Sequence, residues 1–163
     1  MANPTGGDDL GSLLDKLEGT KSPSAAGQAS PEDAWVAKFN DHRAKVIRPA
    51  LEALGKEIEK RGHDFLIAER EFRRGNRAIP DEAQVKIDIY LADEKSRTKI
   101  NADRRPGLAF ITKHKTQTVQ VMISDITSRG GSDSRIGEFP LDKVDTAFIR
   151  DKFIALFKRL VAK

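Results

Sequence analysis

Two kinds of hydrophobic periodicity divide this chain. Residues 83–92 alternate strictly, with four apolar positions separated by polar ones: Val85, Ile87, Ile89 and Leu91. A period of two is typical of a β-strand with one face buried and one face in water. Residues 31–61 instead have a helical period, with apolar positions three and four apart. The pattern therefore predicts a long helix followed by a sheet.

Three more strands are expected on either side of that alternating segment, at residues 64–72, 108–115 and 118–127, and residues 135–139 could form a short fifth strand. Their connections are rich in turn-forming residues, and neighbours joined by short connections usually pair antiparallel. Each strand has one apolar face, so a single sheet needs cover on one side only. We predict an α+β fold, a two-layer sandwich in which an antiparallel sheet of four to five strands carries a long N-terminal helix and a C-terminal helix on one face.

The long helix has clear ends. Ser30 is a good N-cap, Pro31 suits the first helical position, and Gly62 stands where a helix stops. Its apolar residues form two rows about a quarter-turn apart. The first row is Trp35, Phe39, His42, Val46, Pro49 and Ala53. The second row is Ile47, Leu51, Leu54 and Ile58. Pro49 near the changeover predicts a kink.

Helix length suggests a partner. A helix over residues 31–61 spans roughly 46 Å, whereas a nine-residue strand spans about 30 Å. One end of the helix should therefore extend past the sheet and leave apolar side chains in water. These predicted partner-binding residues are Trp35, Phe39, His42 and Val46. We expect a homodimer or an assembly subunit, and the alternative is a kinked helix that wraps its own sheet.

The closing helix is predicted from residue 146 onward. Asp145 is a good N-cap, and Val144 and Ile149 stand at the positions of a hydrophobic staple. The predicted buried stripe is Ile149, Phe153, Leu156, Phe157 and Leu160. The domain is thus expected to occupy residues 31–163.

Residues 1–30 are rich in Gly, Ser, Ala, Pro and Thr, which is typical of a disordered tail. A short amphipathic segment at residues 10–18 interrupts this composition. Its leucines follow the i, i+3, i+4, i+7 pattern: Leu10, Leu13, Leu14 and Leu17. Such a segment could dock in the groove of a partner, as amphipathic peptides do. The alternatives are a loosely helical tail or one that packs on its own domain, because isolated helices this short are marginal in water.

Composition narrows the class of protein. The 163 residues include no cysteine, which excludes disulfides, thiolate metal sites and cysteine nucleophiles. With no membrane-spanning run and no secretory signal, we expect a cytoplasmic protein without a membrane partner. The net charge of +4 is modest. Basic residues nevertheless gather in loops 93–107 and 129–135, which meander topology should bring to one end of the sheet. An anion or nucleic acid could bind there, through Lys95, Arg97, Lys99, Arg104, Arg105, Arg129 and Arg135.

Evidence for an enzyme is weak. Asp81 followed by Gln84 and Lys86 resembles the PD-(D/E)xK nuclease signature in its rarer Gln variant. The aspartate, however, precedes the strand directly instead of lying on an earlier one. We therefore expect no catalytic residue, metal or cofactor, and predict a non-enzymatic protein-interaction module or assembly subunit. A nucleic-acid-binding accessory protein is the alternative, and a metal-dependent nuclease the remote one.

Overall fold

The computed structural model describes residues 30–75, 78–94 and 104–162. The chain divides into two compact units, Met1–Ala34 and Trp35–Lys163, and the fold described here is that of the second unit. Two groups of predicted site residues lie outside the described residues. They are Leu10, Leu13, Leu14 and Leu17 near the N-terminus, and Lys95, Arg97 and Lys99 in the connection after the second strand.

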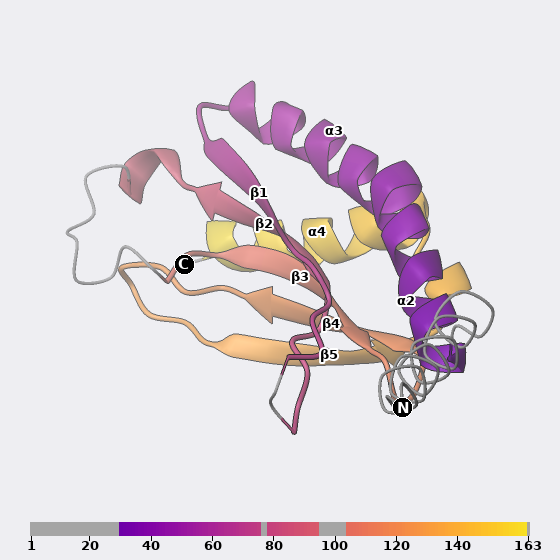
Figure 1. The fold of residues 1–163 in the computed structure, drawn as a ribbon. Coiled ribbons are helices and arrows are strands. Elements are labelled where there is room, and N and C mark those ends of the chain that lie inside the picture. Colours follow the sequence, from indigo (N-terminus) through magenta and orange to yellow (C-terminus); the bar gives the residue numbers. More distant parts are fainter. Residues whose placement is uncertain (1–29, 76–77, 95–103, 163) are drawn as a thin grey trace, which may run out of the picture. The chain divides into compact units, whose positions relative to one another are not determined.

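Five antiparallel strands form one sheet in sequential order, as predicted (Figure 1). The strands are β1 (Asp64–Arg70), β2 (Gln84–Tyr90), β3 (Gly107–Lys113), β4 (Thr118–Ser124) and β5 (Asp133–Phe139). The pairing is regular except for a β-bulge opposite Val121 and Met122. The predicted fifth strand therefore exists, and it begins two residues earlier than expected.

The alternating pattern of β2 determines which face is buried. Val85 and Ile87 are fully buried and Ile89 is 1% exposed, whereas the polar residues between them are only partly buried. Leu108 and Phe110 of β3 continue the same face. The core is one cluster that joins this face to apolar residues of the helices. The α+β two-layer architecture is thus confirmed.

The long helix is continuous but not α-helical throughout. It consists of α2 (Pro31–His42), a π-helical turn η1 (Arg43–Ile47) and α3 (Arg48–Glu59). Within η1 the Arg48 amide donates to the carbonyl of Arg43, five residues back. Pro49 has no amide hydrogen and its ring crowds the carbonyl four residues earlier. A wider turn directly before Pro49 relieves that crowding, so the predicted proline kink takes the form of a π-helical turn.

Both ends of the long helix follow the sequence prediction. The Asp33 amide donates to the Ser30 hydroxyl at 3.1 Å, which is the expected N-cap bond. At the other end Gly62 has a φ of +88°. The His63 amide donates to Ile58 O at 3.1 Å and the Gly62 amide to Glu59 O at 2.9 Å, the two bonds of a Schellman motif.

The predicted overhang of the long helix is wrong. Trp35 and Val36 are 7% exposed and Phe39 is fully buried, and all three belong to the common core. His42 is partly buried, and its Nε2–H donates to the Val144 carbonyl. The helix reaches the core here because it turns at η1 and lies against the end of the sheet near β3–β5 (Figure 1). A comparison of helix length with strand length takes no account of this bend, and the alternative of a kinked helix that wraps its own sheet describes the structure better.

Polar side chains close this end of the sheet. Arg43, only 6% exposed, donates to Arg70 O at 3.1 Å and to Glu71 Oε1 at 2.6 Å. Nearby, the Glu82 carboxylate accepts from the Thr112 hydroxyl at 2.7 Å and pairs with the His114 ring. These bonds give hydrogen-bond partners to polar groups at the strand ends that would otherwise be buried without one.

The closing helix α4 covers Thr146–Val161. The Phe148 amide donates to Asp145 Oδ1 at 2.8 Å, which confirms the predicted N-cap. Val144 and Ile149 are both fully buried, consistent with the hydrophobic staple. Of the predicted buried stripe, Phe157 is only partly buried. It lies on the side of α4 that faces α3.

A candidate protein-binding groove between α3 and α4

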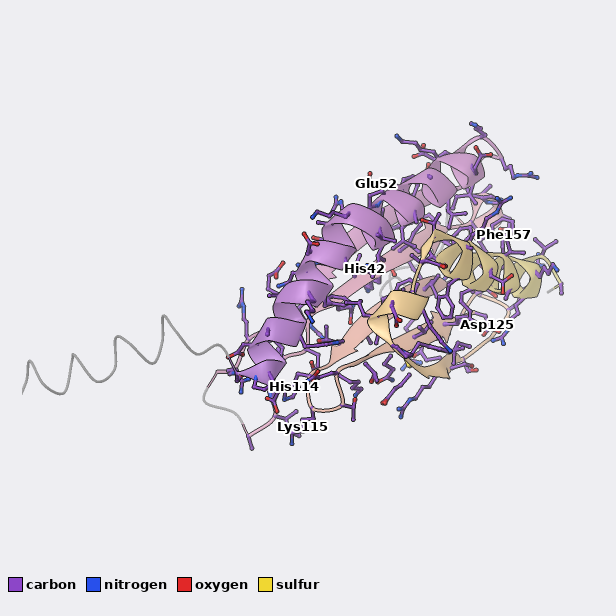
Figure 2. All side chains as sticks on the ribbon, turned by 90° about the vertical axis from the view of Figure 1, so that its right-hand side faces the viewer. His42, Glu52, His114, Lys115, Asp125 and Phe157 are labelled. Carbon is purple, nitrogen blue, oxygen red and sulfur yellow. The ribbon has the colours of Figure 1, made fainter. Side chains whose placement is uncertain are left out.

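An apolar groove lies between α3 and α4, entirely within the unit Trp35–Lys163. Its volume is about 920 Å³. Ala53 and Leu54 line it from α3, and Phe153 and Phe157 line it from α4. Ile154 and Val161, also in its lining, are 39% and 72% exposed. Figure 2 views these helices, with Glu52 labelled on α3 and Phe157 on α4. Exposed apolar side chains gathered in one groove are typical of an interaction surface.

The groove exists because each helix has more apolar residues than the sheet can cover. On α3, Leu51 and Ile58 are buried in the core, and Ala53 and Leu54 lie beside them on the groove side. On α4, Leu156 and Leu160 are buried, while Ile154 and Phe157 line the groove. A helix surface packs on a sheet over part of its circumference only. The remaining apolar residues therefore face each other across the gap.

A glycine sets the depth of α3 on the sheet. Gly55 lies directly against the Phe65 ring of β1, and a Cβ at this position would stand 2.5 Å from ring carbons. Any side chain here would push α3 and β1 apart. The close approach seats α3 on β1. The main contact of α4 with the sheet is to β3, and the groove lies between the two helices.

The rim of the groove is mainly basic. Its charged residues are Arg61, Arg150 and Lys158 against one acid, Glu57, a net charge of +2. A hydrogen bond from Lys60, 2.8 Å long, holds the pKa of the Glu57 carboxyl below its ordinary value. Glu57 is therefore charged at neutral pH, and the net charge of +2 applies there. A negatively charged occupant is favoured.

The residues predicted to bind a partner through the long helix are placed elsewhere. Trp35 and Phe39 stack with ring centroids 6.1 Å apart and are buried in the core. His42 and Val46 are only partly buried, and His42 is bound to Val144. The reason given for self-association through this row, its exposure to water, is thus contradicted. The amphipathic segment at 10–18 lies outside the described residues.

The described residues of the two connections with basic residues, β2–β3 and β4–β5, meet at one end of the sheet. The Ser128 amide donates to Glu94 Oε1 at 2.7 Å, which joins the two connections. Yet acidic groups accompany the basic ones that are described. Arg129 pairs with Asp93 at 3.7 Å, and Arg135 pairs with Glu138. Anion or nucleic-acid binding here stays a prediction.

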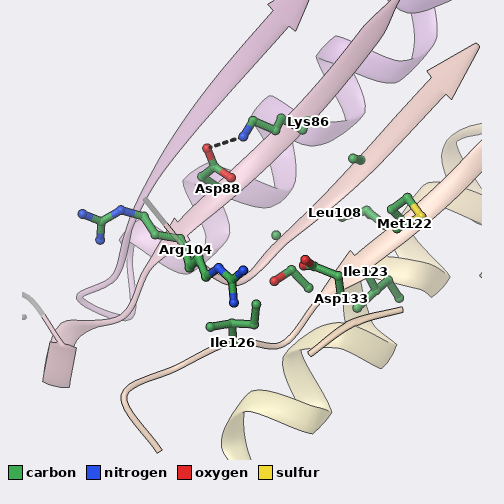
Figure 3. A pocket seen from close by; sticks show the side chains of 12 residues that line it. Lys86, Asp88, Arg104, Leu108, Met122, Ile123, Ile126 and Asp133 are labelled. Carbon is green, nitrogen blue, oxygen red and sulfur yellow. Dashed lines mark ion pairs between the residues drawn. The ribbon is translucent and has the colours of Figure 1, made fainter. Parts of the chain in front are cut away.

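Arg104 and Arg105 border a smaller hollow of about 190 Å³ on the face of the sheet opposite the helices (Figure 3). Gly107 and Ala109, the smallest residues of β3, also line the hollow. The Arg105 guanidinium lies 4.0 Å from the centroid of the Tyr90 ring. Lys86 pairs with Asp88 at 3.4 Å, and Asp133 also lines the hollow. Because both basic and acidic side chains line this hollow, its charge favours no particular class of ligand.

The residues of the remote nuclease hypothesis are not assembled into an ion site. Asp81 pairs through its backbone with Arg73 in a short bridge, and Lys86 is bonded to Asp88, which is not part of the signature. In the part of the chain that the structure describes, no group of three His, Asp or Glu residues could hold a metal ion. Nuclease activity stays an untested alternative.

Comparison with known proteins adds no family. No protein-family model, curated protein or solved structure matches this chain. Among residues 30–75, 78–94 and 104–162, no helix is both long and apolar enough to cross a bilayer.

The groove is the feature that sequence reasoning missed. Ile154 and Val161, apolar residues of α4 outside its buried stripe, were the signal that could have indicated it.

Proposed function

We propose that this chain is a non-enzymatic protein-interaction module that binds an amphipathic helix in the groove between α3 and α4. The proposal is carried by one observation. The groove has an apolar lining that includes the exposed residues Ile154 and Val161, and basic residues stand at its rim. Helix-in-groove recognition uses an apolar helix face for affinity and flanking charges for orientation.

The dimensions of the groove fit a helix of three to four turns. Its α3 wall runs from Ala50 to Arg61, about 17 Å, and its α4 wall from Thr146 to Ala162, about 24 Å. Eleven to sixteen helical residues have this length. The volume of about 920 Å³ is at the upper end of that of small-molecule pockets, which bury most of their ligand. An open trough suits a helical segment better than a compact ligand.

The charge of the rim favours an acidic partner over a second copy of this domain. A two-fold symmetric dimer through the groove would place the same rim on both sides. A rim with Arg61, Arg150 and Lys158 against one Glu57 would then face a second rim of the same net charge, +2. An amphipathic helix whose apolar row is flanked by Asp or Glu meets no such repulsion.

A defined probe tests the proposal. The probe is a fluorescein-labelled synthetic peptide of 16 residues with leucines at i, i+3, i+4 and i+7, glutamates beside that row and alanines elsewhere. It is titrated into the full-length protein, and binding is followed by anisotropy. We expect saturable binding that weakens about tenfold or more in Ile154→Asp, since this change places a carboxylate on the groove floor. Binding should also weaken with added salt.

Leu66→Asp is the matched control for that substitution. Leu66 is 52% exposed on β1, on the face of the sheet away from the helices. It receives the same apolar-to-acidic change without touching the groove, and we expect no change in probe affinity. An absence of saturable binding, or equal losses in Ile154→Asp and Leu66→Asp, would refute the proposed function.

A further inference from the structure

One segment of this chain has the chemistry that the groove requires. In residues 8–18 four acidic side chains outnumber one lysine, a net charge of −3. On a helical projection at about 100° per residue, Asp9 and Glu18 flank the leucine row on either side. The row itself is Leu10, Leu13, Leu14 and Leu17. An acidic amphipathic segment is therefore part of the same polypeptide as a basic apolar groove.

The two also agree in length. Eleven helical residues, from Asp8 to Glu18, span about 16 Å, close to the 17 Å or so of the α3 wall. A segment this short with Gly11 in it is a weak helix by itself. Burial of the leucine row on a partner surface would stabilise such a helix, which is the usual behaviour of segments that fold on binding.

The connecting residues are long enough for binding within one chain. Between Glu18 and Ser30 the backbone can extend to about 40 Å. The near end of the groove, at Ala50, lies nineteen helical residues after Pro31, or about 29 Å along the helix. The tether reaches the groove without full extension.

We infer that residues 8–18 bind the α3–α4 groove of their own chain. This inference rests on the proposed function of the groove. Tethering gives the segment a high effective concentration, so even weak intrinsic affinity fills the groove. A partner helix must then displace the segment, and its apparent affinity is reduced by the fraction of chains that are occupied. The tail thus regulates access to the groove.

A spin label tests the inference directly in the full chain. The protein has no cysteine, so Thr20→Cys gives a single attachment site next to the segment for a nitroxide. We expect strong paramagnetic broadening of the methyl signals of Ile154 and Val161, and little at Leu66 on the far side of the sheet. In the Leu13→Asp/Leu14→Asp variant the groove signals should recover. Equal broadening at the groove and at Leu66 would overturn the inference.

Mixing separates binding within one chain from binding between chains. Spin-labelled protein without isotope is added to isotope-labelled protein without a spin label. Groove signals that keep their intensity support binding within one chain, whereas groove signals that broaden in this sample overturn it. A matched variant, Thr5→Asp/Gly6→Asp, adds the same two charges outside the segment and should leave the broadening of the labelled chain intact.

The helical probe distinguishes this inference from the proposed function. Release of the segment in Leu13→Asp/Leu14→Asp should tighten probe binding about tenfold, while Thr5→Asp/Gly6→Asp leaves it unchanged. Equal probe affinity in all three proteins would overturn the inference and leave the proposed function standing. Failure of the probe to bind any of them would overturn the proposed function itself.

Discussion

The two ends of the long helix present apolar residues that look alike in sequence and serve different purposes. Near its start, Trp35 and Phe39 are buried in the domain's own core. Towards its end, Ala53 and Leu54 line a groove that remains open to solvent. Both sets follow a helical period. The period therefore identifies an apolar face, and the path of the helix determines whether that face meets the core or a partner.

The largest effect is expected at the buried end. Phe39→Ala should lower the free energy of unfolding by about 3–5 kcal/mol, because it removes a fully buried ring and leaves a cavity. Chemical denaturation monitored by circular dichroism measures this. The probe should still bind the folded fraction at low temperature. A loss below 1 kcal/mol would mean that Phe39 is not part of the core. It would support the prediction that the start of the helix extends past the sheet.

Phe39→Leu is the control for that variant. It keeps most of the apolar volume, so the cost should be about 1.5 kcal/mol or less. If the two variants were equally stable, cavity formation would not be the reason for the loss. Trp35, whose ring stacks on Phe39 at 6.1 Å, then reports the change through its fluorescence, since it is the only tryptophan of the chain.

Arg43 should produce the next largest effect. Its guanidinium, buried within the π-helical turn, donates to Arg70 O and Gln84 O at 3.1 and 3.4 Å. Arg43→Ala removes donors from carbonyls at the strand ends, and we expect a loss of about 1–3 kcal/mol. Glu71, the ionic partner, is 58% exposed and stays hydrated. A denaturation midpoint unchanged from wild type would contradict this role.

Gly55 tests how closely α3 packs on β1, beside the groove. Gly55→Ala gains about 1 kcal/mol of helix propensity, but its Cβ would stand 2.5 Å from the Phe65 ring. Overpacking costs about 1–3 kcal/mol, so the net change should be a small loss of stability. Combining it with Phe65→Leu should recover part of that loss. A clear stabilisation in Gly55→Ala would show that α3 can shift freely on the sheet.

The sequence alone predicted features that depend on neighbouring residues. The alternation around Val85 indicated a half-buried strand, and Ser30 and Asp145 marked helix starts that the structure confirms by their cap bonds. The order of β3, β4 and β5 followed from short connections. Each of these signals lies within a few residues of the element that it determines, so one sequence was sufficient.

Other features depend on residues far apart in the chain. The π-helical turn before Pro49 redirects α2, and a pattern of apolar positions holds no information on that direction. Gly55 packs against the Phe65 ring of β1, and nothing in the helical pattern around this glycine indicates that contact. The groove is formed by two helices about a hundred residues apart, and its lining residues become a site only when both helices are placed.

The smallest expected effect concerns the charge of the groove rim. Glu57 is its only acidic residue, and Glu57→Gln would raise the net charge of the rim from +2 to +3. We expect the glutamate-rich probe to bind about two- to threefold more tightly in low salt, with the gain lost at high salt. Since Lys60 lowers the pKa of Glu57 in the folded state, the salt bridge between them stabilises the fold above the ordinary pKa of a glutamate. That contribution disappears as the pH falls through the lowered value. The titration of Glu57 by NMR should therefore shift upward in Lys60→Ala. If Glu57→Gln leaves probe affinity at low salt unchanged, the apolar lining of the groove alone determines affinity. The groove residues would then differ from the buried residues Trp35 and Phe39 only in their exposure to solvent, and not in the charge beside them.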